Sequence, residues 1–500
     1  MRTLLVGKRG LVLLYLVCAA ATAFGCDQLP AGETLWIRLA APISTYTAKV
    51  GEPVHAVLTQ DVVCDNEVVL PMGTPIEGVV LKRHKVGLGI VHETATLELE
   101  FDRAEVMPGV TVAFKARVEE VENAREQVKN GVIEGVLSSD TFQGRINSRL
   151  IHLPTWNPYS DPVLIVYKAA FPIFPEPEIY YPAGTDMRLE TTSEVSLTPE
   201  VVSAEHAPAL DADAGPEQSE QMDQLVEQLP WRVTTKKHVD ADVVNIVFVG
   251  SRDEVKDAFR EAGWHNADRG STRTVMKNLY ALLNNSGYER QPMMTFMLDG
   301  KPEDMNWQRS LNSYGRRDHL RIWQWTGQID GEPVWAGSST HDTSAVLAVK
   351  HIGFVHHVAP DIDDERSAVI RDLNFAGCVQ SVSYVARPEV PAEVRNATGD
   401  EMYTDGSVAV VTLQRCRPED PQLDMDLKGA SFKAGNIAFR FVRRQILTFR
   451  NDIWRANIIY GAYDVGRMTV MALRHHPAVA PSSGETLAKK TKPPVAYGGQ

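Results

Sequence analysis

The sequence has little of what marks most enzymes and nucleic-acid-binding proteins. Its 500 residues include only five cysteines, none of them in a CxxC pair, so neither a zinc-ribbon nor a thioredoxin-like site is predicted. No GxSxG, HExxH or P-loop sequence occurs, and no GxGxxG in a strand–helix context. Acidic residues outnumber basic ones, and the formal net charge of -13 argues against nucleic acid as a partner.

The N-terminus has the pattern of a secretory signal peptide. Arg2, Lys8 and Arg9 give it a positive start, residues 11–21 form an apolar run, and the small residues of Ala21-Thr22-Ala23 suit cleavage. The apolar run is shorter than the roughly 20 residues that span a bilayer. We therefore expect residues 1–25 to be a signal peptide and the protein to be exported to the periplasm or cell envelope.

Two cysteine questions follow from the prediction of export. The segment from Ala23 to Cys26 resembles the lipobox of bacterial lipoproteins, although Phe24 departs from the small residue usual there. Cleavage after Ala23 and lipid attachment at Cys26, which would anchor the protein to a membrane, both stay open. An oxidising compartment also permits a disulfide between Cys378 and Cys416, and two buried free thiols are the alternative.

Residues 33–197 have the pattern of an antiparallel β-barrel or sandwich. Strands are predicted where apolar and polar residues alternate between turn residues, at 34–39, 53–58, 75–81, 95–101 and 110–116. The phrase Pro-x-Gly-Thr occurs twice, at 71–74 and 182–185, and each copy precedes a strand-like run. One shared turn and two unrelated turns are equally compatible with this repeat. Residues 142–177, rich in proline and aromatic residues, are predicted to be a long excursion from the barrel.

The second half of the chain begins after an acidic segment. From residue 200 to 228 there are eight Asp or Glu residues and no Lys or Arg, so we expect residues 198–230 to be a linker with a short helix near 222–229. Residues 231–471 then predict a mixed α+β domain, and residues 476–500 a disordered tail. Strands are expected at 243–249, 293–298, 316–325 and 408–413, and helices after the capping box Ser251–Glu254 and at 271–284 and 363–376.

Short phrases in both halves resemble known families. Gly51-Glu-Pro-Val54 and the first Pro-x-Gly-Thr phrase resemble the β-barrel of TrbI-type conjugation proteins, which implies a fold but carries no function over. Four phrases of the second half resemble the LssY C-terminal-domain family, in the order 262–264, 317–323, 333–337 and 357–366. That resemblance implies the architecture of a mixed α/β domain and no mechanism.

Most of the polar residues that could carry chemistry lie in or beside these phrases. The candidate site consists of Arg317, His319, Arg321, His341, Asp342, His357, Asp361, Asp364 and Arg366. Imidazoles and carboxylates would suit a metal, and the arginines would suit a phosphate or another anion. A third interpretation is structural, with Asp361 capping a helix and Arg366 pairing locally.

The sequence specifies no activity, cofactor or oligomeric state. We predict an exported envelope protein that binds or scaffolds, with envelope proteins or a membrane surface as partners and no role for nucleic acid. The alternative is a metal- or phosphate-dependent envelope hydrolase. Convergence of His319, His341, His357 and Asp361 on one cleft would favour the hydrolase, whereas scattered side chains would favour the binding protein.

Overall fold

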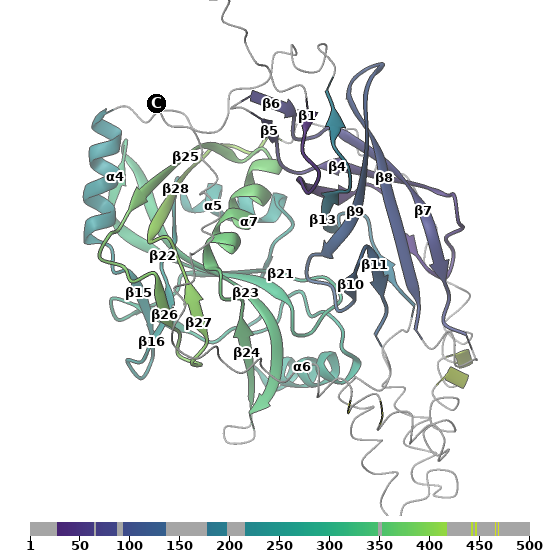
Figure 1. Cartoon of the computed structure of the whole chain (residues 1–500). Coiled ribbons are helices and arrows are strands. Elements are labelled where there is room, and N and C mark those ends of the chain that lie inside the picture. The colour runs from purple at the N-terminus through teal and green to yellow at the C-terminus, as the bar shows by residue number, and fades with distance from the viewer. Residues whose placement is uncertain are drawn as a thin grey trace, which may run out of the picture.

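The computed structural model describes most of both predicted domains. It covers residues 28–64, 67–87, 94–136, 178–197, 216–348 and 353–417, together with residues 442, 443, 446, 447, 466 and 469. The predicted signal peptide, Cys26, the proline-rich excursion, most of the linker and the predicted tail lie outside the described residues. Figure 1 shows the two domains side by side, with long barrel strands facing a mixed sheet and its helices.

The first domain is a closed antiparallel barrel. Six strands pair in the order β8–β7–β4–β2–β13–β9, and β9 returns to β8. Alternation gives the strands one buried face: in β9, Val112, Phe114, Ala116 and Val118 are buried while the residues between them are exposed. The strands are β2 (Thr34–Leu39), β4 (Pro53–Leu58), β7 (Pro75–His84), β8 (Thr96–Met107), β9 (Val110–Val121) and β13 (Asp186–Thr191).

Short antiparallel ribbons surround the barrel. β10 (Gln127–Lys129) and β11 (Val132–Glu134) extend the sheet from β8. Three further pairs join segments at its ends: β1 (Gln28–Leu29) with β14 (Val195–Ser196), β3 (Ile43–Ser44) with β12 (Tyr180–Tyr181), and β5 (Val62–Cys64) with β6 (Glu67–Leu70). The first two of these pairs hold together segments that are far apart in the sequence, whereas β5 and β6 are neighbours in the chain.

The repeated Pro-x-Gly-Thr phrase folds into the same turn twice. Gly73 and Gly184 both have positive φ, 86° and 84°, which glycine adopts without strain. In each turn the threonine hydroxyl donates to the proline carbonyl, at 2.6 Å in the first copy and 2.8 Å in the second. Each glycine N–H also donates to a leucine carbonyl of a neighbouring strand, Leu58 or Leu39. The two copies are therefore equivalent turns that start β7 and β13.

The second domain is built on a mixed sheet. Its strands run in the order β18–β21–β22–β23–β17–β28–β25, with β24 also paired to β23, and only the β17–β28 pairing is parallel among the described strands. Their bounds are β17 (Ile246–Val249), β18 (His265–Asn266), β21 (Met305–Arg309), β22 (Arg317–Ile329), β23 (Glu332–Ala348), β24 (Gly353–Val358), β25 (Val379–Ala386) and β28 (Ser407–Leu413). The predicted combination of an antiparallel barrel and a mixed α/β domain is confirmed.

Different elements cover the two faces of this sheet. Helices α5 (Arg252–Glu261) and α7 (Ile362–Phe375) bury Phe259, Val369 and Leu373 against one face. Helix α4 (Pro216–Gln228) packs on the other face beside a small sheet of β15 (Arg232–Thr235), β16 (Asp240–Val243), β19 (Phe296–Leu298) and β20 (Lys301–Pro302). Helix α6 (Thr272–Asn284) and the ribbon of β26 (Glu393–Arg395) and β27 (Glu401–Tyr403) complete the domain.

Two sequence expectations change in this domain. The predicted helix at 222–229 begins earlier, at Pro216, and Met222, Leu225 and Val226 pack in the second domain's core, so this part of the expected linker is structured. Their helical spacing gives α4 an apolar face that the domain buries. The strand expected at 243–249 is divided into β16 and β17, because Asn245 turns inward and bonds Ser339 and Ile362.

The helix starts follow from capping residues. Ser251 and Glu254 form the predicted capping box of α5, and Ser271 caps α6. Asp361 caps α7 by accepting hydrogen bonds from the backbone of Asp363 and Asp364. Beyond the end of α7, Cys378 is joined to Cys416 by a disulfide. In the part of the chain that the structure describes, none of the helices combines the length and apolar character needed to cross a membrane.

Candidate functional site at the domain junction

One face of β22 carries three of the candidate residues, Arg317, His319 and Arg321. Arg317 donates to Asp342 at 2.7 Å, and His319 Nδ1 lies 3.4 Å from the other oxygen of this carboxylate. The side chains of Arg317, His319 and Asp342 are all buried, and His319 also contacts the Thr340 hydroxyl at 2.7 Å. Burial lowers the pKa of His319 to about 3 against the attraction of Asp342, so this imidazole is neutral. Arg317 thus balances Asp342 inside the domain.

The remaining arginines of the set lie apart and have acidic partners. Arg321 lies 3.3 Å from Asp242 and stacks on the Phe296 ring. Arg366 binds Asp405 through two nitrogens, at 2.9 and 3.1 Å, and also donates to the Ser407 carbonyl. With Arg317 held by Asp342, the three guanidinium groups form no common anion site, and each acts in a local pair.

The other candidate residues do not converge on one cleft. His357 contacts Asp400 at 2.7 Å, while Asp361 is occupied as the cap of α7 and Asp364 is exposed in the first turn of that helix. His341 lies on the face of β23 opposite His319, because its register partner is Asp318. The structure therefore does not bring His319, His341, His357 and Asp361 together in one cleft. They lie in separate sets of contacts.

A network of buried charges joins the two domains instead. Arg38 of β2 and Asp186 of β13 are register partners in the barrel, 2.6 Å apart. Arg309, at the end of β21 in the second domain, pairs with Asp186 and lies 3.0 Å from Asp372 of α7. Arg38 completes the circuit by reaching Asp372 at 3.3 Å. Burial opposes ionisation of Asp186, but Arg309 and Arg38 outweigh it and hold its pKa below the usual range.

Arg371 of α7 makes a second bridge of the same kind. Its guanidinium pairs with Glu122 of the barrel and stacks over the Trp36 ring, 3.8 Å from the ring centroid. Both Arg371 and Glu122 are largely buried, with side-chain exposures of 7% and 17%. We refer to Arg38, Glu122, Asp186, Arg309, Arg371 and Asp372 as the junction network. Its ion pairs across the junction join a barrel residue to a residue of the second domain, among them Asp186 with Arg309, Arg38 with Asp372, and Glu122 with Arg371.

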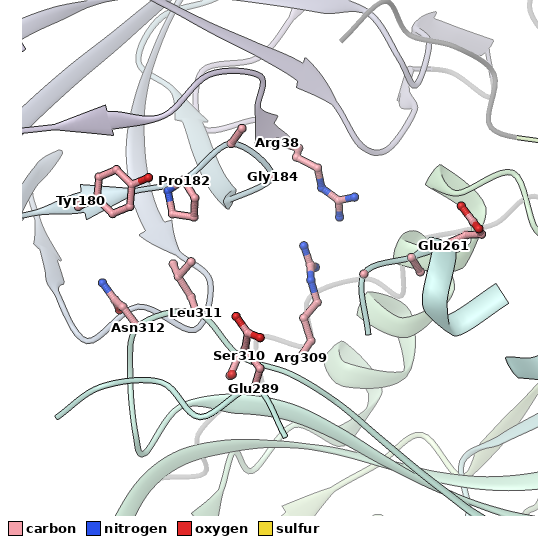
Figure 2. A pocket seen from close by; sticks show the side chains of 13 residues that line it. Arg38, Tyr180, Pro182, Gly184, Glu261, Glu289, Arg309, Ser310, Leu311 and Asn312 are labelled. Atoms are coloured by element: carbon pink, nitrogen blue, oxygen red, sulfur yellow. The ribbon is translucent and has the colours of Figure 1, made fainter. Parts of the chain in front are cut away.

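A cavity of about 430 Å³ borders the junction network. Figure 2 shows Arg38 and Arg309 directed toward one another from the two domains, with Tyr180, Pro182 and Leu311 along the wall. Glu261 and Glu289 also line this space. Because Asp186 and Asp372 already hold both arginines, the cavity offers no free pair of guanidinium groups for a phosphate.

A second group of ionisable residues lies near the network and has the geometry of a metal site. Asp318 of β22, His341 of β23 and Glu365 of α7 each offer a ligand atom, and these atoms lie within 4.8 Å of one another. Asp318 Oδ1 is 2.6 Å from His341 Nδ1, and the second oxygen of Asp318 accepts a hydrogen bond from Asn123 of the barrel, also at 2.6 Å. We refer to Asp318, His341 and Glu365 as the junction triad.

The members of the junction triad respond differently to burial. Desolvation raises the pKa of Glu365 well above its usual value, and the nearby Asp318 carboxylate raises it further. Burial also opposes charge on His341 and on Asp318, but their mutual hydrogen bond prevails, so the pKa of His341 is raised and that of Asp318 is lowered. Asp318 is therefore the ionised member of the triad, and Glu365 is the member that burial keeps neutral.

Sequence reasoning missed Asp318, Glu365 and the junction network. Asp318 lies on the face of the predicted strand opposite Arg317 and His319, and Glu365 resembles an ordinary acidic residue of a helix start. A usable signal was present, because an acidic residue next to Leu320 on a buried strand face needs a partner. The partner of Arg309 is Asp186, too distant in sequence for any local pattern to indicate.

Comparison with known proteins supports the assignment of the second domain. Residues 225–408 match the family model described as LssY C-terminus. The predicted resemblance is thereby confirmed, and the junction triad lies inside the matched residues. A solved structure of ComB10 from the Com type IV secretion system of Helicobacter pylori is 13% identical, covers 34% of this chain and 89% of that chain, and has a TM-score of 0.20, too low to support an argument. No curated protein matches the chain.

Proposed function

We propose that this protein is exported and acts in the cell envelope as a rigid two-domain unit that binds or scaffolds other envelope components. The observation that carries the proposal is the junction network. Domains within one chain usually meet through surfaces that allow relative motion. Here the domains meet through buried ion pairs, and removing one partner of such a pair leaves the other charge buried at a cost of about 3–5 kcal/mol.

Three features support a location outside the cytoplasm. The first residues have the pattern of a signal peptide, with Arg2, Lys8 and Arg9 before an apolar run. Cys378 and Cys416 are joined by a disulfide, a bond that persists in oxidising compartments. Cys26 stands where a lipid anchor would be attached, which would place the barrel domain next to a membrane.

The hydrolase alternative has less support. A hydrolytic metal or phosphate site needs convergent ligands at an open position for the substrate. His319 and His357 lie in separate contacts with Asp342 and Asp400, and the arginines expected to hold an anion are each paired with a carboxylate. These pairs stabilise the domain and leave binding through its surfaces as the better proposal.

The test uses the full chain in a bacterial host. Mass spectrometry of the mature protein is expected to find either Phe24 as the N-terminus or a lipid-modified Cys26. Retention of Met1 on a cytoplasmic protein would refute the envelope role.

Crosslinking in intact cells tests the scaffolding role. We expect the same envelope adduct from the wild type and from the control Arg260→Met, whose side chain is 58% exposed and pairs only within α5. The variant Arg309→Met, exported in equal amount, is expected to lose that adduct because the two domains no longer hold one orientation. An unchanged adduct in Arg309→Met, or no adduct from any variant, would contradict a rigid binding unit.

A further inference from the structure

We infer that the junction triad is a binding site for one divalent transition cation, which would bind at the contact between the barrel and the second domain. The inference is independent of export and of any binding partner. Three elements contribute to the site: β22 provides Asp318, β23 provides His341, and the first turns of α7 provide Glu365. The cross-strand register of Asp318 with His341 holds two of the three side chains together.

The second observation is a buried oxygen without a partner. Glu365 is 4% exposed, and its Oε1 has no hydrogen-bond partner among the described residues. Asn123, which donates to Asp318 from the barrel side, also has a buried Oδ1 without a partner. Buried acceptors are normally satisfied, and unsatisfied ones commonly mark a missing ion or water. Here the unsatisfied atoms are oxygens beside a carboxylate, the surroundings that attract a cation.

Formal charge distinguishes the triad from its neighbours. In the junction network three guanidinium groups face three carboxylates, so none of these carboxylates requires an added cation. The triad adds two carboxylates and one imidazole. Arg309, although it is the register partner of Asp318, is occupied by Asp186 and Asp372. A divalent cation bound to Asp318, Glu365 and neutral His341 would complete the charge balance without another protein group.

The ligand set selects the class of cation. One imidazole with two carboxylates suits Zn²⁺ or a neighbouring first-row cation such as Mn²⁺. Ca²⁺ requires about six to eight oxygens, more than this group supplies, and Mg²⁺ retains most of its water. The His341 side chain is 20% exposed, so the site borders solvent at this ligand while Asp318 and Glu365 are buried.

The cation connects the domains through Asn123. This residue follows β9 with a positive φ of 56°, a conformation that asparagine tolerates better than most side chains, and its amide reaches Asp318 at 2.6 Å. An amide that holds a metal-binding carboxylate orients the ligand, and loss of such a partner typically weakens metal affinity about 10–100-fold. The barrel therefore positions a ligand that belongs to the second domain.

Zn²⁺ titration of the purified full chain tests the site, after chelator treatment and at neutral pH. Calorimetry is expected to find one Zn²⁺ per chain, with Mg²⁺ and Ca²⁺ binding far more weakly. Glu365→Gln keeps the shape of the side chain and is expected to weaken Zn²⁺ affinity by at least about 100-fold, while Asn123→Ala weakens it by about 10-fold. The control His357→Gln alters a histidine–carboxylate pair outside the triad and should leave the affinity unchanged.

Circular dichroism and thermal unfolding in chelator establish that each variant is folded. Glu365→Gln is the decisive variant, because Asp318 substitutions also remove the hydrogen bond to Asn123. Absence of saturable Zn²⁺ or Mn²⁺ binding to the wild type would overturn the inference. Wild-type Zn²⁺ affinity in Glu365→Gln would overturn it as well, since the ion would then be bound by other histidines of the chain.

Discussion

Two groups of charged residues lie close together at the same domain junction, and they are neutralised differently. The junction network pairs carboxylates of both domains with Arg38, Arg309 and Arg371. The junction triad has no arginine of its own, and Glu365 is left with an unpartnered oxygen. Arginine keeps its charge at any physiological pH, so the network is complete without an added ion. The triad must instead take up protons or a cation.

The contrast explains why only one of the two groups is a candidate for ligand binding. A buried, fully paired network fixes the orientation of the domains but has no capacity left for another molecule. An incompletely satisfied group at the same depth costs stability unless something is added to it. The junction therefore combines a contact that needs no added ion with one that is left incompletely satisfied.

The largest expected effect concerns the network. Arg309→Met leaves Asp186 and Asp372 buried with one guanidinium fewer, and we expect the free energy of unfolding to fall by about 3–5 kcal/mol. Urea unfolding of the full chain measures this loss. The control Arg260→Met removes an exposed pair and should change stability by less than about 0.5 kcal/mol. Equal stability of the two variants would show that the network does not hold the domains.

The next effect is a pH dependence. The pKa of Asp186 is lowered in the folded protein, so this carboxylate contributes stability above its unfolded pKa, and the contribution is lost as pH falls below about 4. Asp186→Asn should therefore be less stable than the wild type at neutral pH. Its deficit should shrink on acidification, by at most about 1.4 kcal/mol per pH unit. Urea unfolding at several pH values measures the deficit, and a deficit independent of pH would contradict an ionised Asp186.

The smallest effect is expected in the triad when metal is absent. Because burial first, and then Asp318, raise the pKa of Glu365 well above its usual value, this side chain is neutral without a cation. Glu365→Gln should then change the free energy of unfolding in chelator by no more than about 1 kcal/mol. Asp372→Asn on the same helix breaks ion pairs with Arg309 and Arg38 and should cost clearly more. A larger loss for Glu365→Gln than for Asp372→Asn would reverse the comparison.

Much of the fold could be predicted because local chemistry encodes it. Alternation in Val110–Val121 specifies a strand with one buried face, and Ser251 with Glu254 specifies the start of a helix. Asp361 was identified both as a candidate ligand and as a candidate cap, and the structure shows the cap. Each of these features depends on residues a few positions apart.

The site could be predicted only in part. Arg317 and His319 share one face of β22 because side chains alternate along a strand, but both faces of that strand are buried at its start. The sequence does not show which face meets the barrel, so the contact of Asp318 with Asn123 stayed hidden. Likewise Arg309, Asp186 and Asp372 come from three distant segments. Their pairing depends on how the domains dock, which no periodicity records.

A double-mutant cycle between Asp186 and Arg309 tests the central claim most directly, namely that charges across the junction hold the two domains as one unit. Urea unfolding would be measured for the wild type, Asp186→Asn, Arg309→Met and the double variant. We expect the two losses to be strongly non-additive, with a coupling of about 1–3 kcal/mol, because the residues contact each other across the junction. Additive losses, with a coupling below about 0.5 kcal/mol, would mean that the domains do not depend on this contact.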